Sequence, residues 1–213
     1  MERMTLRSGS NKERGVMSDR REPAAGSPGA TEEVVPPLRG SYWVLPGRLL
    51  AGRCPIRHDP GDTARDLGVL IESGIRCVID LMDGKEVDRD GNPFPDYGDA
   101  LTRVARAAGT AVTRRKIPVD HLAPEEGAIR TVLDAIDGAL AEGKPVFLHC
   151  WAGRGRTGVI VGCYLVRNGL SGREALEEIA RLRGHLESEH PSPEAETQRK
   201  IVLTWQDTTR AAG

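Results

Sequence analysis

The sequence predicts an α/β domain in which a central, mostly parallel sheet of about four or five strands is flanked by helices. Two observations lead to this prediction. Short apolar segments alternate along the chain with longer segments whose apolar residues recur at helical spacing. The chain has 213 residues, 38% of them hydrophobic, which suffices for one such domain with its own core.

The charge balance and composition exclude several classes of function. The chain carries 30 Lys and Arg residues against 31 Asp and Glu residues, so no bulk charge attracts nucleic acid or an anionic membrane. No apolar run approaches the roughly 20 residues that span a bilayer, and the polar N-terminus lacks the pattern of a secretory signal. The cysteines show neither a CxxC pair nor zinc-like spacing: Cys54, Cys77, Cys150 and Cys163. We therefore expect a reduced, cytoplasmic protein with no metal or cofactor, no nucleic-acid partner and no membrane insertion.

The first 40 residues differ in composition from the rest of the chain. They mix charges with Gly, Ser and Pro and contain almost no periodic apolar residues. Such a segment buries too little surface to offset the entropy cost of ordering. We expect a disordered tail over 1–40, one folded domain over 41–208 and a short C-terminal tail over 209–213. The role of the first tail and the oligomeric state stay open.

The domain begins with a predicted hairpin. Segments 42–45 and 48–52 are short and apolar, and the Pro-Gly pair between them is typical of a tight turn. Residues 62–73 form the first predicted helix. Gly74 ends it, because glycine readily adopts the left-handed conformation that follows many helices.

The middle of the chain continues the alternation. Segment 75–81 is mostly apolar, which is typical of a strand covered on both faces. A loop rich in Gly, Pro and Asp follows over 83–97, then a helix over 98–108 that Gly109 ends, and a strand over 111–117. Strands that alternate with helices favour parallel pairing.

The next helix has the clearest periodicity in the chain. Its apolar residues recur on one face at Ile129, Val132, Leu133, Ile136, Ala139 and Leu140. An apolar strand follows over 145–149. The helix over 157–168 is apolar almost all round, so we expect it near the centre of the domain.

Two further helices complete the predicted domain. Ser171 and Glu174 have the spacing of a capping box that opens a helix ending at Arg183. Ser192-Pro193 predicts the start of the last helix, with proline at the first helical position.

The segment from His149 to Gly158 lies between the last predicted strand and the most apolar helix. An α/β sheet binds its ligand in such a place, at the carboxyl end of a strand and the N-terminus of a helix. A glycine-rich turn there aims successive backbone N–H groups inward, and with the positive helix end they form a cradle for an anion. Gly153 and Gly155 permit the tight path of the turn. Arg156 offers a planar fork that binds two oxygens of a phosphate.

Cys150 opens the same loop. A thiol among inward N–H groups, beside a helix N-terminus and an arginine, favours the thiolate, which is the nucleophilic form. A thiolate next to a phosphate cradle suits in-line displacement at a phosphoryl group. The loop lacks the Gly-Lys-Ser/Thr ending of a nucleotide-binding loop, so we expect chemistry on the phosphate itself.

The segment resembles the HCxxGxxRTG signature that tyrosine-specific, dual-specificity and phosphoinositide-directed members of the cysteine-dependent phosphatases share. Every signature position is present. The resemblance implies that Cys150 is the nucleophile that becomes a phosphocysteine and that Arg156 clamps the phosphate. The Thr157 hydroxyl would help the thiolate leave, and His149 would orient the loop. The same resemblance places the substrate phosphate against Trp151, Ala152, Gly153, Arg154, Gly155 and Arg156.

The chemistry also needs a proton for the leaving oxygen, so we expect a carboxylic acid on a mobile loop. Asp120 lies 30 residues before Cys150, between a predicted strand and a predicted helix. Its Asp-x-x-x-Pro context is similar to the general-acid loop of the compact dual-specificity phosphatases. The alternative for Asp120 is an ordinary turn aspartate. Other carboxylates compete for the acid role: Asp83, Asp88, Asp90, Asp96, Glu125 and Glu126.

Other segments also resemble small bacterial dual-specificity-like phosphatases. They are residues 45–52 and 74–81 and the distal Ser-Pro-Glu segment at 192–194 with Gln198. For Gln198, docking of the last helix is the alternative to a place in the site. The resemblance covers about residues 42–206 and implies the cysteine phosphatase fold.

The resemblance implies a metal-independent hydrolase of phosphate monoesters that acts through a phosphocysteine. We expect phosphotyrosine proteins, or proteins with phosphotyrosine and phosphoserine or phosphothreonine, as substrates, or a small phosphate ester. An inositol phosphate or phosphoinositide is the alternative within this class, and a non-catalytic phosphate-binding module is the second alternative. A sulfurtransferase or an arsenate reductase fits the spacing and place of the Cys–Arg pair poorly. Basic residues that favour a polyanionic substrate, unless they form a solvated edge, are Arg114, Arg115, Lys116 and Arg154.

Several residues near the loop have two interpretations. Trp151 forms either a pocket wall or part of the core. His121 either contacts the substrate or lies at the surface. The other three cysteines are small core residues, unless one of them traps oxidised Cys150 as a disulfide.

Overall fold

The computed structural model describes residues 35–88, 90–186 and 190–207. Residues 1–34 of the predicted N-terminal tail and the whole predicted C-terminal tail over 209–213 lie outside the described residues. Within the described ranges, no helix combines the length and the apolar character needed to cross a membrane.

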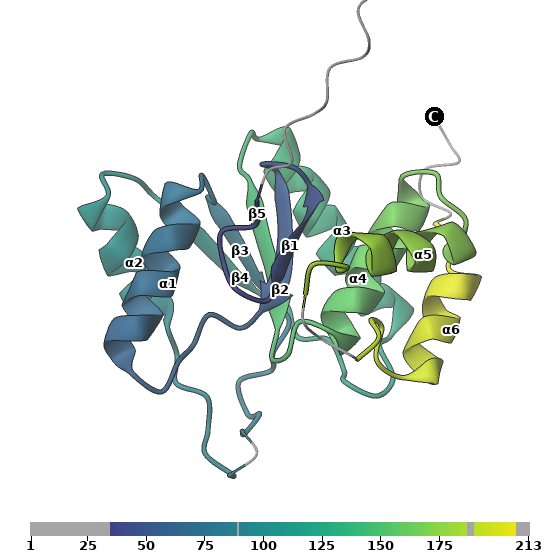
Figure 1. Ribbon diagram of the computed structural model, residues 1–213, viewed down its shortest axis with the longest axis horizontal. Coiled ribbons are helices and arrows are strands. Elements are labelled where there is room, and N and C mark those ends of the chain that lie inside the picture. The colour runs from purple at the N-terminus through teal and green to yellow at the C-terminus, as the bar shows by residue number, and fades with distance from the viewer. Residues whose placement is uncertain (1–34, 89, 187–189, 208–213) are drawn as a thin grey trace, which may run out of the picture. The chain divides into compact units, whose positions relative to one another are not determined.

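A five-stranded sheet forms the centre of the domain. Its strands are β1 (Ser41–Leu45), β2 (Leu49–Arg53), β3 (Cys77–Asp80), β4 (Thr113–Lys116) and β5 (Val146–Cys150). The strand order is β1-β2-β5-β3-β4 (Figure 1). β1 and β2 pair antiparallel, whereas all other neighbours are parallel. The predicted α/β class and mostly parallel sheet are confirmed.

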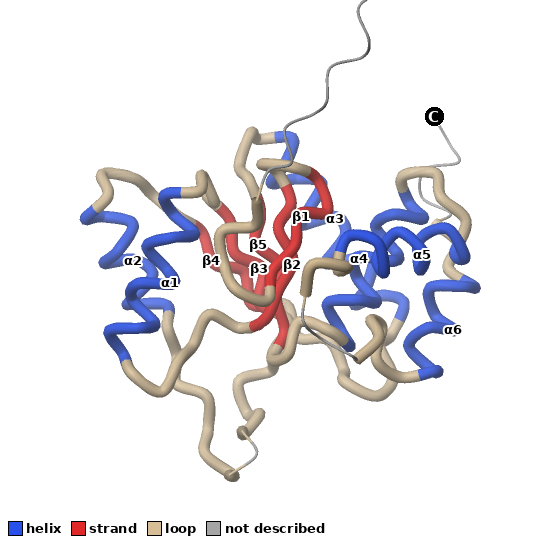
Figure 2. The backbone as a smooth tube through the Cα atoms, viewed as in Figure 1, coloured by secondary structure: helices blue, strands red, loops and turns tan. Residues whose placement is uncertain are grey.

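Helices flank the sheet on both faces. They are α1 (Pro60–Glu72), α2 (Gly98–Ala107), α3 (Glu126–Ala141), α4 (Gly155–Arg167), α5 (Gly172–Leu182) and α6 (Glu196–Thr204). Figure 2 shows α1 and α2 on one side of the strands and α3 to α6 on the other. Because the helices leave neither face uncovered, the domain has two cores.

The central strand β5 contributes to both cores. Val146 and Leu148 belong to the core on the side of α3 and α4, whereas Phe147 belongs to the core with α1 and α2. This alternation follows from the two-residue period of a strand. All five residues of β5 are buried, as expected for a strand covered on both faces. Its last residue, Cys150, is therefore held by a strand that is buried along its whole length.

The capping box predicted for α5 is present. The Glu174 N–H donates to Ser171 Oγ at 3.3 Å, and the Ser171 N–H donates to Glu174 Oε2 at 2.7 Å. Two of the orphan donors at the start of a helix are thereby satisfied.

The start of the last helix was predicted wrongly. α6 begins at Glu196, not at Pro193. The Ser192 hydroxyl donates to the Arg154 carbonyl oxygen at 2.8 Å, which holds the Ser-Pro segment against the beginning of α4. The helix starts only after this tertiary contact, which no local sequence rule encodes.

The structure also describes six residues of the predicted N-terminal tail, residues 35–40. Leu38 is buried and belongs to the same core cluster as Trp43. The Ser41 hydroxyl donates to the Leu38 carbonyl oxygen at 2.7 Å. Residues 35–40 of the predicted tail therefore pack against the domain.

Candidate active site

Cys150 ends β5, and the loop after it leads directly into α4. Its side chain is buried, and Thr157 Oγ1 lies 3.1 Å from Cys150 Sγ as a hydrogen-bond donor. Thr157 is in the first turn of α4, so the helix N-terminus adjoins the thiol. The first backbone N–H groups of a helix have no partner inside it and attract negative charge. The site therefore favours an anion bound beside the sulfur.

Contacts on two sides hold this loop in place. Gly153 has a φ of +69°, and a Cβ added there would lie 2.6 Å from the Arg53 nitrogen, so the loop packs on the end of β2. The Cys54 N–H donates to the Trp151 carbonyl oxygen at 2.9 Å. From the opposite side, Arg183 Nη1 donates to the Gly153 carbonyl oxygen at 3.1 Å. The loop is preorganised before any ligand binds.

Arg156 is almost fully buried beneath the loop. Its Nη1 and Nη2 donate to the two carboxylate oxygens of Glu86 at 2.5 and 2.6 Å, and Nη1 also reaches the Leu81 carbonyl oxygen at 3.1 Å. The Nε atom is buried and has no hydrogen-bond partner among the described residues. Glu86 thus fixes the two terminal nitrogens of the guanidinium, and the Arg156 side chain lies at the same cavity as Cys150.

His149 is fully buried under the loop. Its Nδ1 lies 3.2 Å from the Cys150 carbonyl oxygen, and its Nε2 lies 2.5 Å from the Tyr97 hydroxyl oxygen. Burial lowers the pKa of His149 because the charged ring would lose its hydration. A carbonyl oxygen only accepts, so the neutral ring donates from Nδ1 and accepts the Tyr97 proton at Nε2.

Arg114 is not part of a solvated basic edge. It donates to Asp80 at 2.7 Å and to Asp96 at 2.8 Å, and its guanidinium carbon lies 3.9 Å from the centroid of the Tyr97 ring. The two carboxylates balance its charge, and the stacked ring is held in place. Arg114 therefore supports the Tyr97–His149 pair from behind the site.

The buried, neutral His149 predicts a pH dependence of stability. The unfolded chain binds a proton at this ring near pH 6.5, whereas the folded chain resists it, so the unfolded state holds more protons below that pH. The free energy of unfolding is expected to fall as the pH drops from about 7.5 to 5.5. Urea unfolding at several pH values, compared between wild type and His149→Asn, measures this slope. An equal slope in both proteins would contradict the prediction.

A cavity of about 1040 Å³ opens over Cys150. The residues predicted for the site that line it are Asp120, Cys150, Trp151, Ala152, Arg154, Gly155 and Arg156. Three other predicted residues, His149, Gly153 and Thr157, do not line it and support the loop instead. Trp151 is 38% exposed and packs edge-on against Phe94 with ring centroids 5.5 Å apart, so it forms a cavity wall.

Asp120 lies at the rim of this cavity with its carboxylate in the solvent. Its Oδ1 accepts from the N–H groups of Leu122 at 2.8 Å and Ala123 at 2.6 Å. These hydrogen bonds lower the pKa of Asp120 because they stabilise its charged form. Of the competing carboxylates, Asp83 also lines the cavity. The others do not: Asp88, Asp90, Asp96, Glu125 and Glu126.

Gln198 connects α6 to the Asp120 loop. Its buried amide donates from Nε2 to the His121 carbonyl oxygen at 2.9 Å, and its Oε1 accepts from the Ala195 N–H at 3.1 Å. A Cβ added to Gly155 would lie 2.9 Å from the same amide nitrogen. The Gln198 side chain therefore connects the Asp120 loop to the start of α4. This contact goes beyond docking of the last helix, which was the alternative expected for Gln198. His121 is exposed and lines the cavity.

A family model described as a DSP-PTPase phosphatase of polymorphic toxin systems matches residues 57–170, more than half of the chain. The chain belongs to this phosphatase family. The match contains Cys150, Arg156 and Asp120, together with Glu86.

Two curated relatives match parts of this phosphatase. The triple specificity protein phosphatase PtpB of Mycobacterium tuberculosis is 29% identical over 161 residues, covering 59% of this chain and 57% of PtpB. PTEN1 of Arabidopsis thaliana, a phosphatidylinositol 3,4,5-trisphosphate 3-phosphatase and protein-tyrosine-phosphatase, is 43% identical over 60 residues, which cover 28% of this chain and 14% of PTEN1. The chain thus spans less than two thirds of either relative.

Solved structures show the same fold. The active form of Tk-PTP aligns with a TM-score of 0.56 and 26% identity, over 76% of this chain and 93% of Tk-PTP. The kinase associated phosphatase aligns with a TM-score of 0.60 and 14% identity, over 79% of this chain and 93% of that structure. Both comparisons place this chain among proteins of the cysteine phosphatase fold.

The remaining thiols of this phosphatase family member are buried. Burial raises the pKa of Cys54 to about 12 and also raises the pKa values of Cys77 and Cys163. They therefore stay protonated, as expected for small core residues. No cluster of three or more metal-ligating side chains occurs within residues 35–88, 90–186 and 190–207.

Glu86 is a site residue that the sequence did not reveal, because it is one of several acidic residues in a loop without periodicity. Glu86→Gln is expected to lower kcat/KM for p-nitrophenyl phosphate by about 10- to 100-fold. The amide keeps one hydrogen bond but leaves the buried Arg156 charge without its partner, so the clamp loses its fixed position. The matched control is Glu125→Gln, which removes an exposed carboxylate outside the cavity. Higher activity in Glu86→Gln would mean that Glu86 blocks the clamp instead.

Proposed function

We propose that this protein hydrolyses phosphate monoesters through a phosphocysteine at Cys150, without a metal ion. The observation that supports this most directly is one cavity that is lined by the buried Cys150 thiol and the Arg156 side chain, next to the N-terminus of α4. A dianionic phosphate would satisfy all of these groups at once. Such fixed donors stabilise the charge of a phosphoryl transition state without reorganisation.

The reaction would proceed in two displacements. Cys150 Sγ attacks phosphorus, the S–P bond forms as the ester P–O bond breaks, and Asp120 protonates the leaving oxygen. A water molecule then attacks the phosphocysteine and gives a proton to Asp120, while the S–P bond breaks. Thr157 donates to the departing sulfur. Inorganic phosphate leaves, and both side chains return to their first state.

The substrates that fit this chemistry are phosphorylated proteins and small phosphate esters. We expect the protein to act on them in the cytoplasm. The walls of the cavity include Trp151, Val87 and Val119, which suit an aryl or other apolar group next to the phosphate. PtpB is a triple specificity protein phosphatase. PTEN1 acts both as a phosphatidylinositol 3,4,5-trisphosphate 3-phosphatase and as a protein-tyrosine-phosphatase. Phosphotyrosine proteins are therefore the first class to assay, with small phosphate esters beside them.

Thr157→Ala tests the two-step course. Without the hydroxyl that donates to Sγ, the thiolate becomes a poorer leaving group in the second step. We expect kcat for p-nitrophenyl phosphate, with EDTA present, to fall by about 10- to 100-fold while kcat/KM changes less. Stopped-flow absorbance should then show a burst of p-nitrophenol. Thr157→Ser keeps the hydroxyl and is the control; a variant without a burst and with equal losses in kcat and kcat/KM would contradict the mechanism.

A further inference from the structure

A second cavity, of about 500 Å³, adjoins the one over Cys150. The two share Arg53, Ala152 and Arg154, so only one short stretch of the Cys150 loop separates them. We name it the basic cavity after its basic lining residues, which are Arg39, Arg53, Arg154, Arg183 and His185. No acidic side chain lines it among the residues that the structure describes.

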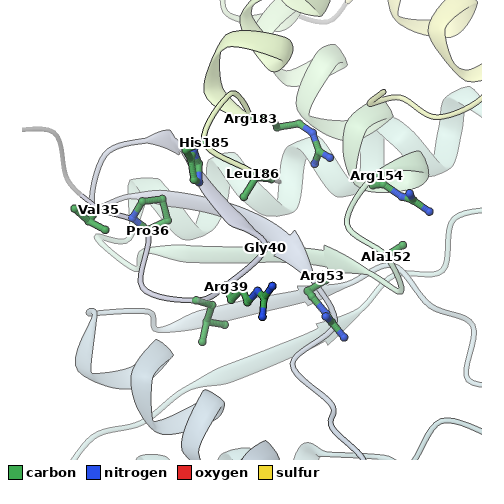
Figure 3. A pocket seen from close by; sticks show the side chains of 11 residues that line it. Val35, Pro36, Arg39, Gly40, Arg53, Ala152, Arg154, Arg183, His185 and Leu186 are labelled. Carbon is green, nitrogen blue, oxygen red and sulfur yellow. The ribbon is translucent and has the colours of Figure 1, made fainter. Parts of the chain in front are cut away.

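The basic residues come from four parts of the chain. Arg39 precedes β1, Arg53 ends β2 and Arg154 lies just before α4. Arg183 caps the C-terminus of α5, and His185 follows it. Figure 3 shows Arg39 and Arg53 on one side of the basic cavity and Arg183 and His185 on the other. The fold therefore brings several cations around one space, although they lie far apart in the sequence.

These cations are partly removed from water. Arg183 is only 9% exposed, and Arg154 pairs with Glu194 at 3.0 Å while its buried Nε has no partner among the described residues. Burial lowers the pKa of Arg53, and the charge of the nearby Arg57 lowers it further. Buried or crowded cations are costly unless an anion compensates them.

We propose that the basic cavity binds a second phosphate group of the substrate while the first lies against Cys150. The substrate class is a small scaffold with two or more phosphates, as in a soluble inositol phosphate or the headgroup of a phosphoinositide. This inference rests on the proposed function and narrows its substrates. Because the two cavities meet at the Cys150 loop, both phosphates belong to one compact molecule.

The number of cations favours phosphate over carboxylate. A phosphate monoester carries about two negative charges near neutral pH and three acceptor oxygens, whereas a carboxylate carries one charge. Arginine forks bind such oxygens in pairs. An acidic residue beside a phosphotyrosine brings only one charge and would engage a single arginine fork.

Full-length variants test the basic cavity by comparing two substrates. Arg53→Gln and Arg39→Gln are assayed on inositol trisphosphate and on p-nitrophenyl phosphate, which has no second phosphate. We expect kcat/KM for inositol trisphosphate to fall by about 10- to 100-fold in each variant, and by a clearly smaller factor for p-nitrophenyl phosphate. Arg65→Gln removes an equal charge from an exposed site on α1 and should change neither value. Equal losses on both substrates would overturn the proposal.

Two further substrates identify the source of the second phosphate. Vesicles of phosphatidylcholine with phosphatidylinositol bisphosphate supply a lipid headgroup, and inositol trisphosphate supplies the free form. Arginine-dependent turnover of either supports the basic cavity, and the larger kcat/KM identifies the source. If only an Asp-flanked phosphotyrosine peptide is turned over in an Arg53-dependent way, the second anion is a carboxylate and the proposal is wrong.

A binding measurement separates this proposal from the proposed function. Calorimetry with Cys150→Ser and inositol trisphosphate needs no turnover, and Arg53→Gln added to this variant should weaken binding by about 10- to 100-fold. If wild type hydrolyses no phosphate ester but this loss is observed, the proposed function fails and the basic cavity stands. If hydrolysis proceeds and the loss is absent, only the basic cavity fails.

Discussion

Replacing Cys150 with serine is expected to lower turnover of p-nitrophenyl phosphate by roughly 10⁴-fold or more. A serine hydroxyl is far less acidic than a thiol, so even beside the N-terminus of α4 it stays protonated, and no covalent bond to phosphorus forms. The replacement is nearly isosteric, and Thr157 keeps a hydrogen-bond acceptor. The fold and the phosphate cradle should therefore persist. Initial rates in the presence of EDTA measure the loss.

Cys77→Ser is the matched control for this experiment. Cys77 is equally buried, but it lies in β3 and lines neither cavity. We expect this variant to lose some stability and to keep its catalytic rate constants. Full activity in Cys150→Ser would show that the thiol is not the nucleophile and that the hydrolysis occurs elsewhere.

Asp120→Asn is expected to lower kcat/KM by roughly 10²- to 10⁴-fold. Asparagine cannot give a proton to the leaving oxygen, so the loss depends on how much the leaving group needs one. p-Nitrophenolate is stable as an anion, whereas phenolate is less so. The loss should therefore be larger for phenyl phosphate than for p-nitrophenyl phosphate, and steady-state assays of both esters measure the difference.

The pH profile gives a second measurement for Asp120. In the present arrangement two backbone N–H groups keep its carboxylate charged, so the loop must release them before the acid form can donate. A general acid works only while protonated, so activity should fall as the pH rises through its working pKa. Asp120→Asn should lose this alkaline limb. If Asp83→Asn shows the losses instead, the acid is Asp83, which also lines the cavity.

The part of the site that could be predicted from the sequence lies in one continuous segment. A short apolar strand, a glycine-rich turn and an apolar helix specify where residues 149–158 lie, because each element depends on local pattern. The structure places the thiol of Cys150 and the guanidinium of Arg156 together at one cavity. Asp120 could be placed near them because it follows a parallel strand, whose carboxyl end meets the same edge of the sheet.

The partners of these residues could not be predicted. Glu86 lies 70 residues from Arg156, and Tyr97 lies 52 residues from His149. Both come from a loop with mixed charges and no period, in which no local signal marks one carboxylate, or the single tyrosine, as a partner of the site. Only the packing of that loop over the sheet edge selects them.

Packing also overrides local rules at the ends of elements. The Ser-Pro pair at 192–193 has the pattern of a helix start, yet the Ser192 hydroxyl donates to the Arg154 carbonyl oxygen and the helix begins at Glu196. Arg114 looks like a surface cation in the sequence, but the sheet places Asp80 within reach of it. In both cases a long-range contact, and not the local sequence preference, determines the structure.

Segments from both ends of the domain contact the Cys150 loop and the Asp120 loop. The domain therefore cannot be shortened to its motif residues without removing these contacts. A fragment trimmed to residues 57–170 would retain the nucleophile, the clamp and the acid. It would lack the β2 backbone against which Gly153 packs, and the Gln198 amide that binds the Asp120 loop. Two of the five strands would be missing from the sheet. We therefore expect such a fragment to carry every motif residue and still lack phosphatase activity.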